Sequence, residues 1–410
     1  MNRRGLLSAA WTAALAAASA DVMGAVTPAA AGRVVVASQY GAVGDGSADD
    51  TRALQAALDA AFGGTPALLV IPPGVYRIAD TLRARVNSAV SHPCGISARG
   101  AHVMSQMRGG QNLFELVVGA AARFVLIEGL DLLGTGRDGH GIYVDCDSPT
   151  ASLENFCLRD VVIQYCGADG ARLAGNASEG QIVNSYFRNN RANGMTLANG
   201  RAGPISSVNV FGCVFGDNQG HGAALLDGCA GGAFHGCYFL LNGAFGLAAE
   251  SGCTLLSNCG FENNHQAADT FEHGDAGLRL GGFGTLVGCM AYSMLKQTHL
   301  IRASLSGELV MVGCSGSGDA QARNAGLARL AGADPASATL IGCSGAVACE
   351  GGFEALEIAA AGGGVRFGSD WRSRNLPRLG DYYLWVDGRG RLRSKKGRPA
   401  ADDDGTPVGA

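Results

Sequence analysis

Short runs of alternating apolar and polar residues return along residues 124–345, separated by turns that carry Gly or Asn. No helical spacing of apolar positions persists through a repeat, so the pattern indicates short β-strands. One small or apolar residue marks the centre of each copy, and the steps between these residues are 22 to 31 residues long. A period in this range is typical of a solenoid. The marked residues are Leu130, Val161, Ser185, Cys213, Cys237, Cys259, Cys289, Cys314 and Cys343.

Three further columns of residues keep the same period. Phe187, Phe215, Phe239 and Phe261 form one column, an Asn follows each Phe by three residues, and a Gly follows three of them by seven. Identical side chains repeated at the strand spacing of about 4.8 Å form apolar files inside a solenoid and amide files at its turns. The columns predict an all-β fold, a right-handed parallel β-helix with one coil per repeat.

Composition agrees with an elongated core. The chain has 410 residues, 47% of them apolar, and its 64 glycines suit a fold with a turn every few residues. Six of the 13 cysteines fall at one position of the repeat, from Cys213 to Cys343. We therefore expect an inward file of reduced thiols rather than a disulfide framework. No closely spaced Cys/His pair predicts a metal site, and we assign no metal and no cofactor.

Charge is divided unevenly between the body and the tail. Residues 21–362 carry 19 basic and 29 acidic side chains, whereas residues 363–410 carry 10 basic and 6 acidic ones. An acidic body disfavours nucleic acid as a partner. It also argues against a strongly polyanionic substrate.

The first 20 residues have the pattern of an export signal. Arg3 and Arg4 precede an apolar run, and Ala18-Ser19-Ala20 forms a cleavage site of the A-x-A type. The paired arginines resemble a twin-arginine signal. No other segment is apolar enough to predict a membrane span. The sequence therefore predicts a periplasmic or secreted protein.

Residues 33–80 predict an N-terminal cap for the solenoid. A helix ending at Phe62 follows Asp49 and Asp50, either of which can cap it, and Leu54 and Leu58 lie on its apolar face. A helix of this kind can cover the open end of a β-helix, where core and strand edges are otherwise exposed. The coils then occupy residues 81–362, and residues 363–410 form a tail with a small predicted hairpin.

The stretch Tyr40–Ile78, with Tyr40-Gly41-Ala42-Val43-Gly44-Asp45-Gly46 and Val70-Ile71-Pro72-Pro73-Gly74-Val75-Tyr76, closely resembles the opening of the pectate lyase superfamily. This group includes rhamnogalacturonase-like and epimerase-like domains and many phage tailspikes. With the repeats, the resemblance covers about residues 35–360 and implies a carbohydrate-active β-helix whose partner is a polysaccharide. It carries no catalytic residue to this chain, because Asp45, Asp49 and Asp50 have structural positions.

The tail resembles C-terminal segments of some tailspike-like and exopolysaccharide-processing β-helix proteins. Its hairpin, Tyr382 to Arg393, is aromatic and basic. It could bind an anionic sugar, contact a neighbouring subunit in a homo-oligomer such as a trimer, or plug the last coil.

Polar residues beside the aligned glycines form the candidate site. Alternate residues of a strand share one face, and adjacent coils lie about 5 Å apart, so these residues should gather in one patch. The expected catalytic residues are His140, Tyr143, Asp169, Arg172 and His221. The expected substrate-binding residues are Asp145, Asn193, Glu272, His273 and Arg279, of which Glu272 and His273 lie in an insertion after Cys259. This insertion also contains His265, Asp269 and Asp275, which leave metal binding as an alternative.

Two reactions fit these residues. Elimination on a uronate needs a cation for the developing enolate, a base and an acid, roles open to Arg172, Tyr143, His140 and His221. Glycoside hydrolysis needs two carboxyl groups, for which Asp169 and Asp145 are the nearest pair. The remaining alternative is a module that binds polysaccharide, or assembles with partners, without catalysis.

Overall fold

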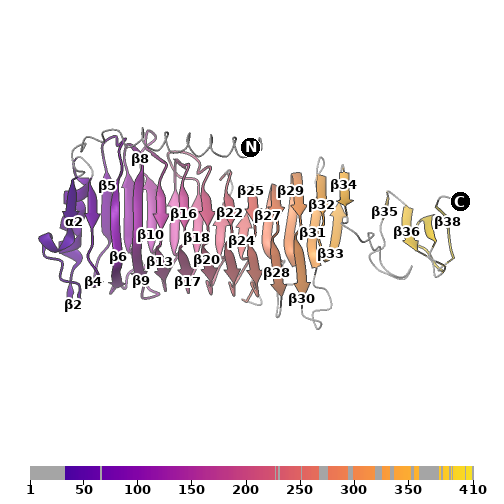
Figure 1. The fold of residues 1–410 in the computed structure, drawn as a ribbon, viewed down its shortest axis with the longest axis horizontal. Helices are drawn as coiled ribbons and strands as arrows, with labels where there is room; N and C mark the ends of the chain where they lie inside the picture. The colour runs from indigo at the N-terminus through magenta and orange to yellow at the C-terminus, as the bar shows by residue number, and fades with distance from the viewer. Residues whose placement is uncertain are drawn as a thin grey trace, which may run out of the picture.

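A computed structural model describes residues 33–64, 67–226, 228–229, 231–250, 252–266, 276–293, 299–318, 326–332, 337–351, 355–359, 378–379, 382–386, 389, 391–401 and 403–408. The predicted export signal, residues 1–20, lies outside them. The fold is the predicted right-handed parallel β-helix, with strands of successive coils paired in parallel (Figure 1). Most of the described coils contribute strands to three faces of the solenoid.

The first face carries the candidate site, and we call it the site sheet. Its strands are β5 (Leu82–Val86), β7 (Phe114–Val118), β10 (Ile142–Cys146), β14 (Ala171–Ala174), β18 (Met195–Ala198), β21 (Ala223–Leu225), β24 (Leu247–Ala249), the first part of β27 (Ala276–Val287) and of β29 (His299–Val312), β31 (Gly326–Gly332) and β33 (Ala346–Gly351).

The other two faces meet at a sharp corner. The face before the corner contains β1 (Val34–Val36), β3 (Leu68–Val70), the first parts of β6 (Cys94–Ser105) and β9 (Val125–Leu133), β12 (Cys157–Arg159), β16 (Gln181–Val183), β19 (Asn209–Phe211), β22 (Ala233–His235), β25 (Cys253–Ser257), the ends of β27 and β29, β32 (Ser337–Ile341) and β34 (Ala355–Ala359). The face after it contains β2 (Asp45–Asp49), β4 (Gly74–Ile78), the ends of β6 and β9, β13 (Val162–Gln164), β17 (Tyr186–Arg188), β20 (Val214–Gly216), β23 (Tyr238–Leu240), β26 (Gly260–Glu262), β28 (Met290–Ser293) and β30 (Ser315–Gly318). A small additional sheet joins β8 (Ala121–Arg123), β11 (Ser152–Glu154) and β15 (Ala177–Ser178).

The corner explains the cysteine column. A residue with positive φ turns the chain there, for example Gly212 and Gly236 at 59°, and the next residue points inward. Cys213, Cys237, Cys259 and Cys289 are fully buried and free of disulfides. Each thiol donates to backbone oxygens; that of Cys237 donates to Val210 O of the preceding coil at 3.5 Å. The predicted inward file is confirmed for these four cysteines and for Cys314, whereas Cys343 is only half-buried.

Two other predicted columns also form. The rings of Phe187, Phe215, Phe239 and Phe261 stack with centroids 5.1, 5.1 and 4.9 Å apart. The four asparagines of the repeat form a buried ladder in which each Nδ2 donates to the next Oδ1, at 2.9, 3.0 and 2.8 Å. The members of this Asn ladder are Asn190, Asn218, Asn242 and Asn264. Both columns fix the register of the coils and therefore of the site sheet.

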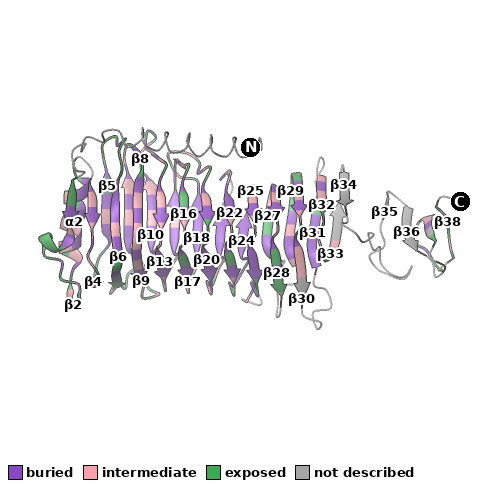
Figure 2. Cartoon of the chain, in the orientation of Figure 1, coloured by how far each residue is buried: buried purple, intermediate pink, exposed green. Residues whose placement is uncertain are grey.

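The cap is built as predicted, with one difference in detail. After the 3-10 helix η1 (Ala37–Tyr40), the helix α2 (Thr51–Phe62) lies at the N-terminal end of the solenoid and buries Leu54, Leu58 and Phe62 (Figures 1 and 2). Asp50 occupies the N-cap position, but its carboxylate accepts from the backbone N–H groups of Val43 and Gly44 instead of capping the helix. The acidic residues of this stretch hold the turn together, which is a structural role.

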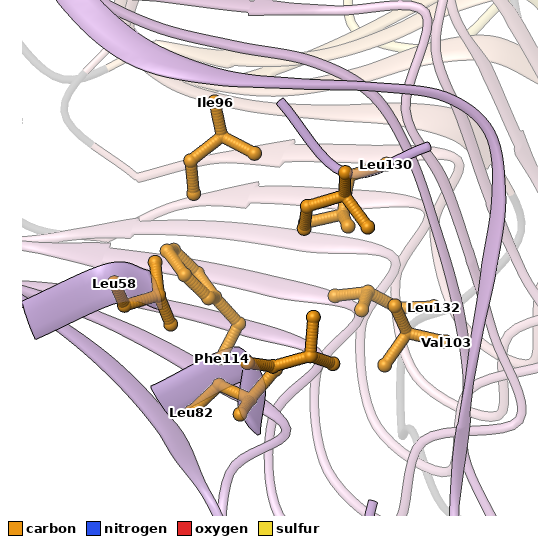
Figure 3. Close-up of a pocket in the computed structure, with 9 residues that line it drawn as sticks. Leu58, Leu82, Ile96, Val103, Phe114, Leu130 and Leu132 are labelled. Atoms are coloured by element: carbon orange, nitrogen blue, oxygen red, sulfur yellow. The ribbon is translucent and has the colours of Figure 1, made fainter. Parts of the chain in front are cut away.

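A small apolar cavity lies between α2 and the first coils (Figure 3). Its lining presents no polar side chain, so it offers no hydrogen bond to a sugar. The lining residues are Leu54, Leu58, Ile71, Leu82, Ile96, Val103, Phe114, Leu130 and Leu132.

The tail forms its own antiparallel sheet from β35 (Arg378–Leu379), β36 (Tyr382–Val386), β37 (Leu392–Lys396) and β38 (Thr406–Pro407). The predicted hairpin is the β36–β37 pair. Arg393 is buried and donates to the backbone oxygens of Asp403 and Gly405. In the part of the chain that the structure describes, no helix is long and apolar enough to cross a membrane.

Candidate functional site

The aligned glycines bring successive coils unusually close at the edge of the site sheet. A Cβ on Gly194 would lie 2.5 Å from the carbonyl oxygen of Gly222 and 2.8 Å from Asn218 Nδ2. A Cβ on Gly170 would meet the oxygen of Gly194 at the same distance of 2.5 Å. Only glycine leaves room for this approach. The glycines thereby stack the polar residues that precede them.

The residues before these glycines, together with Asn112 before Leu113, form a continuous file, which we call the turn column: Asn112, His140, Asp169, Asn193, His221 and Phe245. Each of its polar side chains accepts a hydrogen bond from the backbone N–H of the next member. His140 N donates to Asn112 Oδ1 at 2.9 Å, and Asp169 N donates to His140 Nδ1 at 3.1 Å. Asn193 N donates to Asp169 Oδ1 at 3.0 Å. The column therefore joins the coils as well as presenting polar groups.

The second file of the site, the strand column, runs along the outward positions three residues later. The sheet register aligns Arg83, Glu115, Tyr143, Arg172, Thr196, Ala224, Ala248 and Arg279. Tyr143 and Arg172 are direct neighbours in this register, as the sequence predicted.

Four of the predicted residues meet where the two columns run side by side. Asp169 Oδ2 lies 3.4 Å from Arg172 Nη1 and 3.6 Å from His140 Nδ1. The His140 ring stacks on Tyr143 with centroids 5.7 Å apart. The Asp169 side chain is only 5% exposed, whereas that of Arg172 is 31% exposed. A buried carboxylate thus holds a guanidinium that still reaches solvent, a geometry suited to an anionic group of a ligand.

The hydrogen bonds define the chemical state of the histidines. His140 Nδ1 and His221 Nδ1 each accept a backbone N–H, so the neutral ring carries its proton on Nε2. Burial lowers the pKa of His140, with the Asp169 carboxylate opposing this and the Arg172 guanidinium adding to it. Burial, followed by repulsion from Arg279, lowers the pKa of His221 to about 4. At neutral pH both rings are hydrogen-bond donors at Nε2 rather than bases.

A second group of acidic residues flanks Tyr143. Burial raises the pKa of the Tyr143 phenol, and the Asp145 and Glu115 carboxylates add to this effect. Burial also raises the pKa of Asp145, with Asp147 as the next contributor. Glu115 accepts from Arg83 Nε at 2.7 Å and from Asn112 Nδ2 at 2.9 Å. Tyr143 and Asp145 both point outward from β10, so a neutral phenol and a carboxyl group of raised pKa face the same side.

The remaining predicted residues lie around this centre. Asn193 donates to Thr196 Oγ1 at 3.0 Å and, through Oδ1, accepts from His221 N at 2.7 Å. His221 stacks on Phe245. The charge of Arg279 lowers the pKa of His221, and the charge of Asp169 raises it. Asp145 lies beside Asp147 and Glu115, and no contact joins it to Asp169 among the described residues. The carboxyl neighbours that the structure provides are therefore Asp145 and Glu115.

Part of the outer surface between these groups is closed. Thr196, Ala224 and Ala248 occupy outward positions of the strand column, yet they are at most 4% exposed. Ala248 packs with Phe245 and Ala276 in a small apolar cluster. The outward positions of the strand column on β5, β7, β10 and β14 remain partly exposed.

The insertion after Cys259 is only partly described. Glu272 and His273, together with Asp269 and Asp275, lie outside the described residues. His265 is buried and lies 6.3 Å from Phe245 between ring centroids, and Arg279 is exposed on β27. Within the described ranges, no group of three or more His, Cys, Asp or Glu side chains has the geometry of a metal site.

Sequence reasoning missed Asn112, Glu115 and Arg83. They continue the turn and strand columns by one and two coils toward the N-terminus. The usual glycine is replaced by Leu113 after Asn112, so the marker that aligned the other coils is absent there. The remaining signal is the spacing itself, since Asn112 and Glu115 are three residues apart like His140 and Tyr143.

Three family models match different stretches of the chain. The model for a right handed beta helix region matches residues 117–282, and the model for rhamnogalacturonase A/epimerase, pectate lyase-like matches residues 34–90. The capsule depolymerase model matches residues 354–410, the tail. These matches confirm the resemblance to the pectate lyase superfamily and the class of the protein, a right-handed parallel β-helix.

Solved structures share this fold at low sequence identity. ORF18 of Geobacillus virus E2 is 16% identical with a TM-score of 0.50, and the match covers 88% of this chain and 66% of that one. The A-module of the Azotobacter vinelandii mannuronan C-5 epimerase AlgE6 is 17% identical with a TM-score of 0.48, covering 80% and 100%. The catalytic unit of a GH87 α-1,3-glucanase from Streptomyces thermodiastaticus is 15% identical with a TM-score of 0.49, covering 83% and 70%. No curated protein matches the sequence.

Proposed function

We propose that the protein cleaves an extracellular acidic polysaccharide, such as a bacterial exopolysaccharide, by β-elimination at the Arg172 cluster. The observation that carries this proposal is the meeting of Arg172 with Asp169, His140 and Tyr143 on two adjacent coils. The family matches support a polysaccharide-acting β-helix protein, and the capsule depolymerase match of the tail agrees with an exopolysaccharide.

Each residue has a role that its environment supports. Arg172 binds the uronate carboxylate and stabilises the negative charge that develops when the C5 proton leaves. Asp145, whose pKa is raised, accepts that proton. The electron pair forms the C4–C5 double bond, the C4–O4 bond breaks, and Tyr143, kept protonated by its raised pKa, donates a proton to the leaving oxygen. His140 donates from Nε2 to a sugar oxygen, and Asp169 orients Arg172.

Glycoside hydrolysis is the second candidate because Asp145 and Glu115 are neighbouring carboxyl groups of unequal environment. Burial and Asp147 raise the pKa of Asp145, which suits a general acid, while Glu115 is held by Arg83 and Asn112. A pair of carboxyl groups with different protonation is what hydrolysis requires. In this reaction Arg172 would only position the sugar.

The two reactions and simple binding leave different products. The mature protein is incubated with acidic and neutral exopolysaccharides, and ultraviolet absorbance and reducing ends are measured together. New absorbance from an unsaturated uronate is the expected result. New reducing ends without absorbance would replace elimination by hydrolysis, and binding without either product would replace catalysis by a binding role.

A further inference from the structure

The face after the corner carries a row of outward side chains without charge. Its strands from β13 to β26 are three residues long, so each offers one inward and two outward positions. These strands lie along one long side of the solenoid (Figure 1). The sheet register aligns the first outward position of successive coils, which we call the tyrosine row: Val162, Tyr186, Val214, Tyr238, Gly260 and Met290.

Large exposed side chains recur on every second coil of the row. Tyr186, Tyr238 and Met290 are 42%, 60% and 39% exposed, and the smaller Val214 and Gly260 lie between them. The large side chains therefore repeat at two strand spacings, about 9.6 Å. A Cβ on Gly260 would lie 3.0 Å from Tyr238 Cδ1 and 3.1 Å from Cε1, so the glycine gives the ring room to lie over the next coil.

The same column is different on the coils nearer the N-terminus. There the register continues from Val162 to Asp131 and His102, which form an ion pair at 2.5 Å between Oδ2 and Nδ1. These polar side chains satisfy each other and suit a face that contacts only water. Within the described residues, no hydrogen bond holds the hydroxyl of Tyr186 or Tyr238. Exposed apolar surface gathered in one row, with free polar groups on it, is typical of a binding surface.

The size of the row favours a narrow ligand over a second protein. At about 200 Å² for one tyrosine side chain, the exposed parts of Tyr186 and Tyr238 together amount to about 200 Å². A specific protein interface buries roughly 800 Å² on each partner. A face that is only two outward positions wide does not supply such an area around the row, whereas a single polysaccharide strand is about as wide as one aromatic ring.

We propose that the tyrosine row binds the uncharged faces of an extended polysaccharide that lies along the solenoid axis. The C–H groups of a pyranose gather on its flat faces, and such a face packs on an aromatic ring as apolar surface. Two strand spacings are comparable to the length of two sugar residues in an extended chain, so every second sugar can lie on a large side chain. In the second outward column, Gln164 and Glu262 can bond the hydroxyl groups at the sugar edges.

The row and the Arg172 cluster lie on different faces of the solenoid. A polysaccharide strand on the row is therefore held outside the Arg172 cluster, and binding there requires no cleavage. The row keeps the protein on a polymer surface while another strand occupies the site sheet. This inference goes beyond the proposed function and does not rest on it.

The test measures binding apart from turnover. Affinity electrophoresis in native gels that contain glucomannan, an extended neutral polymer, or dextran, a flexible one, compares the full chain with the double variant Tyr186→Ala and Tyr238→Ala. The matched control is the double variant Tyr40→Ala and Tyr165→Ala, whose side chains are 40% and 49% exposed outside the row. We expect the row variant to bind glucomannan about tenfold or more weakly and the control to bind as the parent does. Replacing both row tyrosines by Phe keeps the rings and should retain most of the binding.

Each outcome decides the proposal. It is overturned if glucomannan does not retain the parent, if the row variant binds as the parent does, or if the control loses as much binding as the row variant. Equal retention of the parent in dextran would overturn the assignment to an extended chain. Light scattering tests the other occupant: a parent dimer that becomes a monomer in the row variant would replace the polysaccharide by a second copy.

Melting curves check folding, and the single variant Tyr238→Ala serves if the double variant does not fold. If binding depends on the row but no polysaccharide is cleaved, the row stands and the proposed function fails. If cleavage depends on Arg172 while the row variant binds as the parent does, the reverse holds.

Discussion

Two files of polar side chains run along the solenoid. Both accept backbone N–H groups from neighbouring coils, but they use different residue types. In the Asn ladder, every member is an asparagine, fully buried and bonded to its neighbours of identical type. In the turn column, Asn, His, Asp, Asn and His in turn accept the backbone N–H of the next coil, whereas the ladder side chains accept that of the preceding coil. A purely structural file tolerates repetition of one residue. The turn column joins its coils with side chains of three types, and we propose that His140 and Asp169 among them also serve the reaction.

The largest effect should come from removing the cation that the turn column orients. Arg172→Ala should lower kcat on the cleaved polysaccharide by about a hundredfold or more, because charge stabilisation in the transition state is lost. The melting temperature should stay nearly unchanged, since the side chain is 31% exposed. The matched control is Arg188→Ala on β17, whose side chain is 38% exposed and which loses an ion pair with Asp217. Equal activity of the two variants would move the site away from the Arg172 cluster.

The next effect compares how much each file contributes to the stability of the protein. Asn218→Ala leaves the N–H and Nδ2 of Asn190 without their acceptor in the core, so unfolding free energy should fall by about 2–4 kcal/mol. Asn193→Ala in the turn column removes the acceptor of His221 N near solvent and should cost about 1 kcal/mol. Denaturant unfolding of both variants measures the difference. If Asn193→Ala costs as much as Asn218→Ala, the turn column is as structural as the Asn ladder.

A smaller effect depends on pH and on His221. Its pKa of about 4 in the folded protein is lower than the ordinary value of about 6.5. The unfolded chain therefore binds an extra proton as the pH falls from about 6.5 to about 4, and stability is lost through that window, while it is fully present above about 6.5. His221→Asn keeps an acceptor for Phe245 N but removes this titration. Melting temperatures between pH 4 and 7 should fall less steeply in the variant than in the parent. Identical profiles would show that His221 is not the group responsible.

Much of the fold could be predicted because residues that repeat at the coil period of a solenoid stack on successive coils. The Phe, Asn and Cys columns repeat at one period, and each proved to be an inward file. The same register placed Tyr143 beside Arg172 and Asp169 beside His140. The coarse position of the candidate site therefore follows from spacing alone.

The rest depends on local geometry that spacing does not contain. The backbone hydrogen bonds that His140 Nδ1 and Asp169 Oδ1 accept depend on the distance between one turn and the next. The spacing of residues in the sequence does not give this distance. Glu115 was missed because Leu113 replaces the glycine that marks the other turns. The burial of the outward Ala224 and Ala248 depends on packing across coils, which an alternating pattern does not reveal.

One pair of substitutions tests most directly whether Asp169 both joins two coils and orients Arg172. Asp169→Asn keeps Oδ1 as the acceptor for Asn193 N but removes the charge that faces Arg172, whereas Asp169→Ala removes both. Turnover and melting temperature are measured for the two variants on the cleaved polysaccharide. We predict that Asn lowers kcat by about tenfold to a hundredfold at nearly unchanged melting temperature, and that Ala lowers both. Full activity of the Asn variant, or a melting temperature as low as that of the Ala variant, would contradict the claim.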